Sequence, residues 1–327
     1  MIQYSIIVPA YQAAATLPRC LAALQDQTLD HAVYEIIVVD DGSTDATAAV
    51  AERALSSPDR VIRAPHGGPA QARNIGAQAA RGELLVFTDA DCEPVHDWLA
   101  QLTVLFKDPT VSGAKGAYRT RQRSLIARFV QQEYQDKYDR LTQQPTIDFV
   151  DTYSAAYRRT VFEAAGGFDP ALIMDEDQEL SFRLAAQGHQ LIFVPLAIVY
   201  HQHVTSAWKY ARRKYGVGYW KALVIKQHPA KARRDSHTPQ VVKFQMGALA
   251  LALPATLLAL LGLPSVIPLA LWLAFILSML PLLAKIAQRD PGVVIVAPIM
   301  LGVRALSLSL GLTIGLIKFA WQSPSRL

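Results

Sequence analysis

The chain has 327 residues, of which 51% are hydrophobic and 18% are charged, so a disordered or fibrous protein is excluded. Its two cysteines, Cys20 and Cys92, cannot form a disulfide framework and are not spaced as a zinc-binding pair. Residues 1–203 carry 17 Lys and Arg against 25 Asp and Glu, residues 204–243 carry 10 against 1, and residues 244–327 carry 5 against 1. This distribution predicts an acidic soluble domain, a basic membrane-surface segment and an apolar membrane region.

Short apolar runs alternate with stretches of helical periodicity in the acidic part. The first run has no basic region and is too short for a signal peptide, so we expect a strand there. The alternation predicts an α/β fold with a mostly parallel sheet and helices on both faces, and such sheets bind ligands at the carboxyl ends of their strands. The expected strands are 5–8, 36–39, 61–63 and 84–88, and the expected helices between them are 17–24, 46–55 and 70–80.

Two of these strands end in residues suited to binding a nucleotide base. Pro9-Ala10-Tyr11 follows the first strand and Asp40-Asp41 follows the second, so an aromatic ring and carboxylates reach the same edge of the sheet. The carboxylate of Asp41 can accept a hydrogen bond from the imide or amine of a base. The alternative is a turn, since Asp-Gly is a turn sequence and Ser43 or Thr44 can cap the next helix.

Asp89 and Asp91 follow the fourth strand, one residue apart. Mg²⁺ or Mn²⁺ binds such carboxylates together with substrate phosphate oxygens, and there it would neutralise a diphosphate leaving group. Arg73 lies near the start of the helix after Gly67-Gly68, where the helix N-terminus also attracts anions. It is either a second electrostatic partner for a diphosphate or a surface cation.

An acidic cluster and two histidines follow further along the chain. Asp177 lies in the acidic start of a helix and is the candidate general base for an acceptor hydroxyl, although acidic residues are also favoured there by the helix dipole. His201 and His203 follow an apolar strand, and alternation places both on one face. They either complete a metal site, for which His201 is the candidate, or end the strand.

These residues lie in blocks whose order and spacing resemble the family-2 glycosyltransferases of the GT-A fold. The resemblance covers about residues 4–203, with a nucleotide-sugar half followed by an acceptor half. The blocks are Ser5-Ile6-Ile7-Val8-Pro9-Ala10-Tyr11, Val38-Val39-Asp40-Asp41-Gly42-Ser43-Thr44-Asp45, Ala72-Arg73-Asn74-Ile75-Gly76, Thr88-Asp89-Ala90-Asp91, Ala155-Ala156-Tyr157-Arg158-Arg159, Gly166-Gly167-Phe168-Asp169 and Glu176-Asp177-Gln178-Glu179-Leu180.

The resemblance implies a role for each candidate residue. Tyr11 and Asp41 hold the base, Asp89 lies near the ribose and diphosphate, Asp91 binds the metal, and Asp177 is the general base. It also implies a nucleotide-sugar donor, with a uridine diphosphate sugar as the default, and inversion at the anomeric carbon.

A motif of one branch of that family is missing. The chain has no Gln-x-x-Arg-Trp sequence, which is typical of processive synthases, so we expect transfer of one sugar per encounter. The anchored layout is similar to bacterial transferases that extend lipid-linked precursors of exopolysaccharide or cell envelope. The alternatives are a catalytically silent nucleotide-sugar-binding partner subunit and a transport element with a regulatory head.

The C-terminal part predicts two or three membrane spans. Residues 244–284 contain no charge, and as helix they would measure roughly 60 Å, about twice the hydrocarbon thickness. We expect two spans, 244–262 and 266–284, joined at Gly262-Leu263-Pro264-Ser265. The third apolar stretch, 291–317, is interrupted by Arg304 and either spans or re-enters the membrane. Within it, Gly311 and Gly315 have a spacing that lets another helix approach closely.

Lys and Arg residues flank the first two predicted spans. The positive-inside rule then places these flanks and the N-terminal domain in the cytoplasm, on the inner membrane of the cell. The segment 204–243 also mixes aromatic rings with cations, which favours contact with membrane lipids and holds the cleft near a lipid-borne acceptor. Its position next to a span argues against nucleic acid as the partner.

Overall fold

The computed structural model describes residues 1–233, 235–262 and 264–320 of the chain. They form two compact units: residues 1–121 with 138–202, and residues 122–137 with the chain from His203 onward. The sequence predicts that residues 122–137 belong to the first domain, whereas the structure groups them with the C-terminal helices. Leu263 of the expected turn and the last seven residues of the expected membrane region lie outside the described residues.

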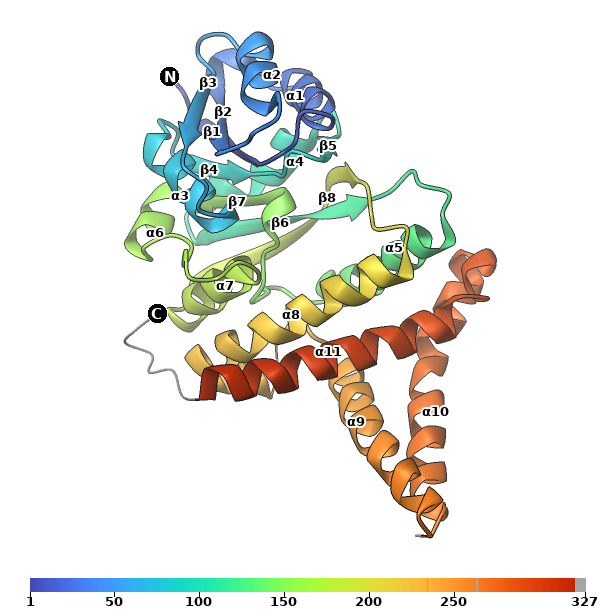
Figure 1. Ribbon diagram of the computed structural model, residues 1–327. Coiled ribbons are helices and arrows are strands. Elements are labelled where there is room, and N and C mark those ends of the chain that lie inside the picture. Colours follow the sequence, from blue (N-terminus) through green and yellow to red (C-terminus); the bar gives the residue numbers. More distant parts are fainter. Residues whose placement is uncertain (234, 263, 321–327) are drawn as a thin grey trace. The chain divides into compact units, whose positions relative to one another are not determined.

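The first unit is built on an eight-stranded sheet with the order β3-β2-β1-β4-β7-β6-β8-β5 (Figure 1). β1 pairs in parallel with β2 and β4, β2 with β3, and β6 with β8. β7 is antiparallel to both of its neighbours, and β5 is antiparallel to β8. The strands are β1 (Tyr4–Ala10), β2 (Tyr34–Asp41), β3 (Arg60–Ala64), β4 (Leu84–Phe87), β5 (Cys92–Pro94), β6 (Val111–Arg119), β7 (Ala155–Arg158) and β8 (Gln190–His201).

Helices cover both faces of this sheet, as the βα alternation predicts. α3 packs on β1 and β2, while Tyr34, at the start of β2, donates a hydrogen bond to the carbonyl of Leu24 in α1 (2.9 Å). The helices of this unit are α1 (Leu17–Gln25), α2 (Thr47–Ala54), α3 (Pro69–Ala79), α4 (Trp98–Thr103), α6 (Arg159–Ala164) and α7 (Glu176–Ala186), with short 3₁₀ turns at His31–Val33, Val104–Lys107 and Thr152–Ser154.

The register of the parallel strands brings their carboxyl ends together. Ala10 at the end of β1 pairs with Asp40 at the end of β2, and Ile7 pairs with Phe87 at the end of β4. Every residue of β2 is buried, which is typical of a central strand covered on both faces. The loops that follow β1, β2 and β4 therefore leave the sheet at one edge, where the sequence analysis expects the ligand.

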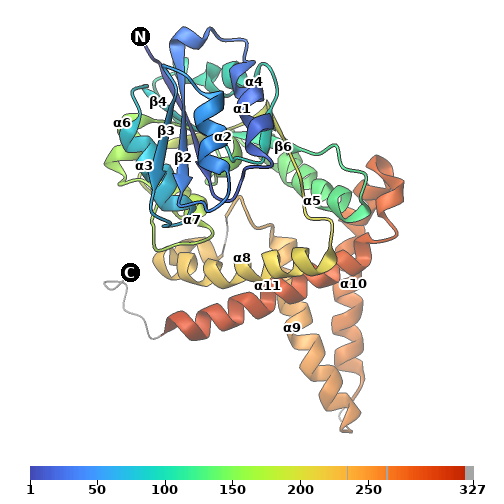
Figure 2. The same ribbon diagram turned by 45° about the horizontal axis from the view of Figure 1, so that its top comes forward.

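The second unit is helical. α8 (Ala207–Gln227) lies alongside α11 (Ala297–Ala320), and α9 (Gln240–Leu260) and α10 (Val266–Arg289) form a hairpin (Figures 1 and 2). Pro229–Ala232 and Pro291–Val293 are 3₁₀ turns, and α5 (Leu125–Leu141) contributes its first thirteen residues to this unit.

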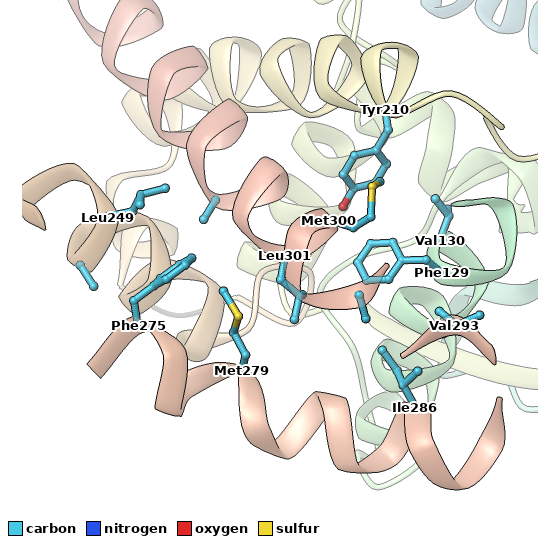
Figure 3. Packing of buried hydrophobic residues seen from close by; sticks show 13 residues of the cluster. Phe129, Val130, Tyr210, Leu249, Phe275, Met279, Ile286, Val293, Met300 and Leu301 are labelled. Carbon is cyan, nitrogen blue, oxygen red and sulfur yellow. The ribbon is translucent and has the colours of Figure 1, made fainter. Parts of the chain in front are cut away.

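Three of these helices are long and apolar enough to cross a membrane: α9, α10 and α11. They correspond to the predicted spans 244–262, 266–284 and 291–317, but the third begins later because Pro291–Val293 forms a separate 3₁₀ turn. A buried hydrophobic cluster joins α5, α8, α9, α10 and α11, and includes Phe129, Tyr210, Leu249, Met279 and Leu301 (Figure 3).

Candidate active site

A pocket of about 530 Å³ opens at the carboxyl edge of the parallel strands. It lies between the loops that follow β1, β2 and β4 and the start of α3. All the residues that the sequence analysis assigned to donor binding line it, together with Asp91. The lining comprises Pro9, Ala10, Tyr11, Gln12, Ala13, Thr16, Asp41, His66, Gly68, Pro69, Ala72, Arg73, Asp89, Ala90 and Asp91.

The loop after β1 is held by hydroxyl groups from the loop after β2 and from the first residue of α2. The backbone amide of Gln12, a residue with φ of 50°, donates to Ser43 Oγ (3.0 Å), and its side chain donates to Thr44 Oγ1 (2.7 Å). The amide of Ala13 donates to Thr47 Oγ1 (2.8 Å). Ser43 and Thr44 therefore support the pocket wall and do not cap α2, whose N-cap residue makes no side-chain capping bond.

Asp41 organises the loop after β3. Its carboxylate accepts hydrogen bonds from the amides of Gly67 (2.8 Å) and Gly68 (3.0 Å), and it lies 3.0 Å from His66 Nδ1. The side chain of Asp41 is only 5% exposed, whereas Tyr11 is half exposed and stacks on the His66 ring at 4.3 Å. The stacked rings of Tyr11 and His66 thus form an aromatic wall of the pocket, and the buried carboxylate of Asp41 contacts the His66 ring. His66 is not recognisable from the sequence, because a histidine before a glycine pair has no distinguishing spacing.

Asp89 and Asp91 offer carboxylate oxygens to the pocket. These oxygens and Cys92 Sγ lie within 4.8 Å of one another, and Asp91 Oδ2 is 3.1 Å from His201 Nε2. Burial, with the nearby aspartates, raises the pKa of the Cys92 thiol well above its usual value, so the thiol stays protonated. A hard divalent cation prefers oxygen to a neutral thiol. Of this group, Asp89 and Asp91 are therefore the donors that fit such an ion, and His201 contacts the group through Asp91.

His201 and His203 have different surroundings. His201 is the last residue of β8, stacks on Tyr118 at 4.6 Å and reaches Asp91. His203 lies beyond the strand end, so the alternation that would place both on one face does not extend to it. Its ring contacts Gln131 Oε1 (3.1 Å) and stacks on Tyr134.

Arg73 links the aspartate pair to the acidic start of α7. Its guanidinium binds Glu176 (2.6 Å) and Asp89 (2.8 Å), and its side chain is only 5% exposed. Arg73 thus already has two acidic partners inside the protein, which weakens the attraction that we expect it to exert on a diphosphate. Burial raises the pKa of Glu176 to about 7, and Arg73 opposes this rise.

Asp177 lies beside this link, in the first turn of α7. Its Oδ1 accepts from the amide of Gln178 (2.8 Å), and its charge contributes to a raised pKa of Arg73. The helix begins after Asp175, which adopts a left-handed conformation with φ of 66°. The sequence points to Asp177 and not to Glu176, because only the folded chain shows that Glu176 is the buried partner of Arg73.

A second link holds the same two parts of the chain together. Asn74 Nδ2 donates to the carbonyl of Phe168 (2.8 Å), and the amide of Phe168 donates to Asn74 Oδ1 (2.9 Å). Arg73 and Asn74 are neighbours on α3, so one turn of that helix fixes both the Gly-Gly-Phe loop and the start of α7.

The sheet topology and the acidic edge define a GT-A-like domain. Residues 5–166 match the family described as glycosyl transferase family 2. The chain therefore contains a glycosyl transferase family 2 domain, as the sequence blocks indicate.

Named relatives carry similar domains. The chain is 27% identical over 234 residues to pre-mycofactocin glycosyltransferase of Mycobacterium tuberculosis, covering 69% of this chain and 48% of that protein. It is 29% identical over 204 residues to glycosyltransferase AglE of Haloferax volcanii, covering 58% of this chain and 63% of that protein. The chain thus spans less than two thirds of the length of these relatives.

Two solved structures share the fold. The mannosyltransferase PcManGT from Pyrobaculum calidifontis, determined with GDP-Man and Mn²⁺, has a TM-score of 0.68 and 22% identity, over 97% of this chain and 87% of that one. GalNAc-T7, determined with UDP, GalNAc and Mn²⁺, has a TM-score of 0.51 and 20% identity, over 73% of this chain and 52% of that one.

Proposed function

We propose that the protein transfers one sugar from a nucleotide-sugar donor to a hydroxyl group of a membrane-associated, lipid-linked glycan acceptor, with a divalent cation and with inversion. The observation that carries this proposal is that one pocket brings Tyr11, Asp89 and Asp91 together. Arg73 connects that pocket to the turn carrying Asp177.

The donor nucleotide occupies the part of the pocket between the loops after β1 and β3. The base stacks on the exposed ring of Tyr11, next to His66, and Asp41 keeps the supporting loop in place. Pro9 and Ala10 form the floor, and Asp89 faces the ribose and diphosphate. A UDP-sugar is the first donor to test, and a GDP-sugar is the second because PcManGT was determined with GDP-Man.

Asp89, Asp91 and His201 would hold Mg²⁺ or Mn²⁺. Their two carboxylates and one imidazole suit a hard cation, and both structural neighbours described above were determined with Mn²⁺. When bound, the ion offsets the negative charge that develops on the departing diphosphate. Arg73 keeps Asp89 pointing into the pocket through their ion pair.

Asp177 acts as the general base. As the acceptor oxygen bonds to the anomeric carbon, the bond from that carbon to the diphosphate breaks and the hydroxyl proton passes to the Asp177 carboxylate. Attack from the face opposite the leaving group inverts the configuration. The first turn of α7 favours a carboxylate there because backbone amides point toward it.

The acceptor is presented at the membrane on the cytoplasmic side. Lys243 precedes the apolar part of α9, and Lys285 and Arg289 end α10, so both ends of the hairpin carry cations. The positive-inside rule places such flanks, and with them the family 2 domain, in the cytoplasm. A sugar acceptor carried by a lipid then diffuses in the plane of the same membrane.

The test is turnover by the purified full-length protein in detergent. Release of nucleoside diphosphate is measured with UDP-glucose, UDP-GlcNAc and GDP-mannose, each with polyprenyl-diphosphate glycan acceptors and with Mg²⁺, Mn²⁺ or EDTA. We expect one donor to support turnover that EDTA abolishes, and NMR of the product to show the inverted anomer. A retained anomer, or turnover unaffected by EDTA, contradicts the mechanism.

A matched pair of variants checks the metal site. Asp91→Asn is expected to lose metal-dependent turnover, whereas Glu93→Gln, two residues further on and paired with Arg19 and Arg121, keeps it. Donor binding without turnover across the whole panel would favour the alternative of a catalytically silent partner subunit.

A further inference from the structure

α11 is apolar enough to cross a membrane, but its neighbour is not. α8 carries six Lys and Arg and no Asp or Glu, and it runs along α11 in the same direction. The facing residues show that the two helices are parallel: Tyr215 lies beside Gly311, and one turn later in both helices Tyr219 lies beside Gly315. The distribution of charge on α8 therefore bears on where α11 can lie.

Small residues bring the two helix backbones into close contact. A β-carbon on Gly218 of α8, or on Gly311 or Gly315 of α11, would overlap backbone atoms of the other helix. At the far end, Lys226 Nζ donates to the carbonyl of Phe319 in the last turn of α11 (2.6 Å). α8 and α11 are thus joined over most of their length.

Arg304 lies on the face of α11 that packs within the unit. Its guanidinium donates to Glu133 Oε1 of α5 (2.9 Å) and to Gln245 Oε1 of α9 (2.7 Å). Glu133 also accepts from Tyr210 (2.8 Å) and lies 3.3 Å from Lys214 of α8. Arg304, the charge that interrupts the apolar stretch, is therefore held in a polar cluster with groups from α5, α8 and α9.

The opposite face of α11 is apolar and exposed. Exposed apolar residues recur at intervals of three to seven positions from Ile299 to Ile317. This spacing places them on one side of the helix, where they form a stripe without charge. The stripe consists of Ile299, Leu306, Leu310, Ile314 and Ile317.

The hairpin of α9 and α10 extends away from the packed pair of α8 and α11, on the side of α11 opposite α8. In both ribbon views α8 lies along one side of α11, and the hairpin extends from the other side, transverse to it (Figures 1 and 2). Exposed leucines and isoleucines cover the hairpin, including Leu257, Leu260, Ile267, Leu269 and Leu273. These are the side chains that hydrocarbon accommodates.

We infer that α11 lies in the plane of the membrane surface, with its apolar stripe against lipid, and does not form a third span. If α11 crossed the bilayer, α8 would have to cross beside it and carry its six cations through hydrocarbon. With α11 in the plane, α8 lies at headgroup depth, where anionic lipid attracts Lys209 and Arg212. The hairpin alone enters the membrane, so both chain ends face the same side.

This inference rests on the membrane attachment proposed above, but not on the chemistry. The first test uses the full-length chain, with Cys20 and Cys92 replaced by Ala and one cysteine added in an N-terminal or a C-terminal tag. Sealed right-side-out and inverted vesicles are treated with a membrane-impermeant maleimide. We expect both tags to react in the same vesicle orientation, and labelling of the two tags from opposite sides overturns the inference.

The second test measures depth. Nitroxide labels are placed one at a time at Ile299, Leu306 and Ile317, and power saturation with oxygen and a nickel chelate is recorded in vesicles of phosphatidylethanolamine and phosphatidylglycerol at 7:3. We expect similar, shallow depths at the three positions, and a much deeper label at Leu257 of the hairpin. A deep Leu306 between shallow Ile299 and Ile317 is the pattern of a span and overturns the inference.

Wild-type protein in vesicles of the same composition is assayed for nucleoside diphosphate release. Labelling and depth do not depend on turnover, so an inactive wild-type protein together with the expected labelling pattern counts against the proposed function only. An active protein with tags on opposite sides counts against the position of α11 only.

Discussion

The acidic pocket edge of the first unit and the ion pair between Glu133 and Arg304 in the second unit place charge in different surroundings. In the first unit, Asp89 and Asp91 lie at the edge of a buried sheet with 29% and 44% of their side chains exposed. In the second, Glu133 and Arg304 pair with each other, at 10% and 8% exposure, while leucines and isoleucines face outward.

The difference follows from the surroundings of each unit. Water reaches the carboxylates of an open pocket. A buried charge has no such solvent, so Glu133 and Arg304 must satisfy each other. The aspartates at the pocket edge can therefore face a ligand, whereas Arg304 is held by partners inside its unit.

The largest effect is expected in the first unit. Asp177→Asn should lower kcat by about 10²–10⁴-fold, because the amide cannot accept the acceptor proton. Donor binding, measured by calorimetry with the nucleotide sugar and Mn²⁺, should remain within about twofold, since Asp177 does not contact the donor in the proposed arrangement. A variant that keeps wild-type kcat excludes Asp177 as the base.

The next effect tests the polar cluster around Arg304 in the second unit. Arg304→Leu leaves Glu133 buried with one cation fewer, and we expect a loss of about 3 kcal/mol. Thermal unfolding in detergent measures the difference, with Lys318→Leu, an exposed cation on α11, as the control.

A third effect concerns the link between the pocket and α7. Burial raises the pKa of Glu176 to about 7, above the ordinary value of 4.5, so the folded protein holds a proton that the unfolded chain releases. The stability this proton contributes is full below about pH 4.5 and is lost as the pH rises through about 7.

Glu176→Gln mimics the protonated side chain, so its stability relative to the wild type should rise as the pH increases from 4.5 to 7.5, by about 3 kcal/mol in all. Chemical unfolding monitored by fluorescence at several pH values gives the comparison. A free-energy difference between the two proteins that does not change with pH would show that Glu176 is ionised throughout.

The smallest effect tests the close contact of α8 and α11. Gly311→Ala places a methyl group against the backbone of Tyr215 and should cost about 1–2 kcal/mol. Gly302→Ala, on the same helix, meets nothing within 4 Å and should be neutral or stabilising by up to about 1 kcal/mol. Equal melting temperatures for the two variants would contradict the packing described.

Much of the fold and of the site in the first unit can be predicted from residues that lie close together in the chain. The apolar runs before Tyr11, Asp41 and Asp89 predict strands, and parallel strands bring their carboxyl ends to one edge, so the positions of these residues follow from local pattern and one topological rule. The family 2 domain is identified from the same blocks. His66 and Glu176 could not be found this way, because each acquires its role from partners that lie 25 and 103 positions away.

In the second unit, composition determined that three helices are apolar enough for a membrane, and the spacing of Gly311 and Gly315 indicated a close helix neighbour. Only the tertiary structure decided that this neighbour is the basic helix α8 and that Arg304 meets Glu133. Hydrophobicity is a property of a segment, whereas the depth of a helix depends on which charges are packed against it. Residues distant in the sequence supply those charges, so the pattern of residues within one helix does not predict its depth.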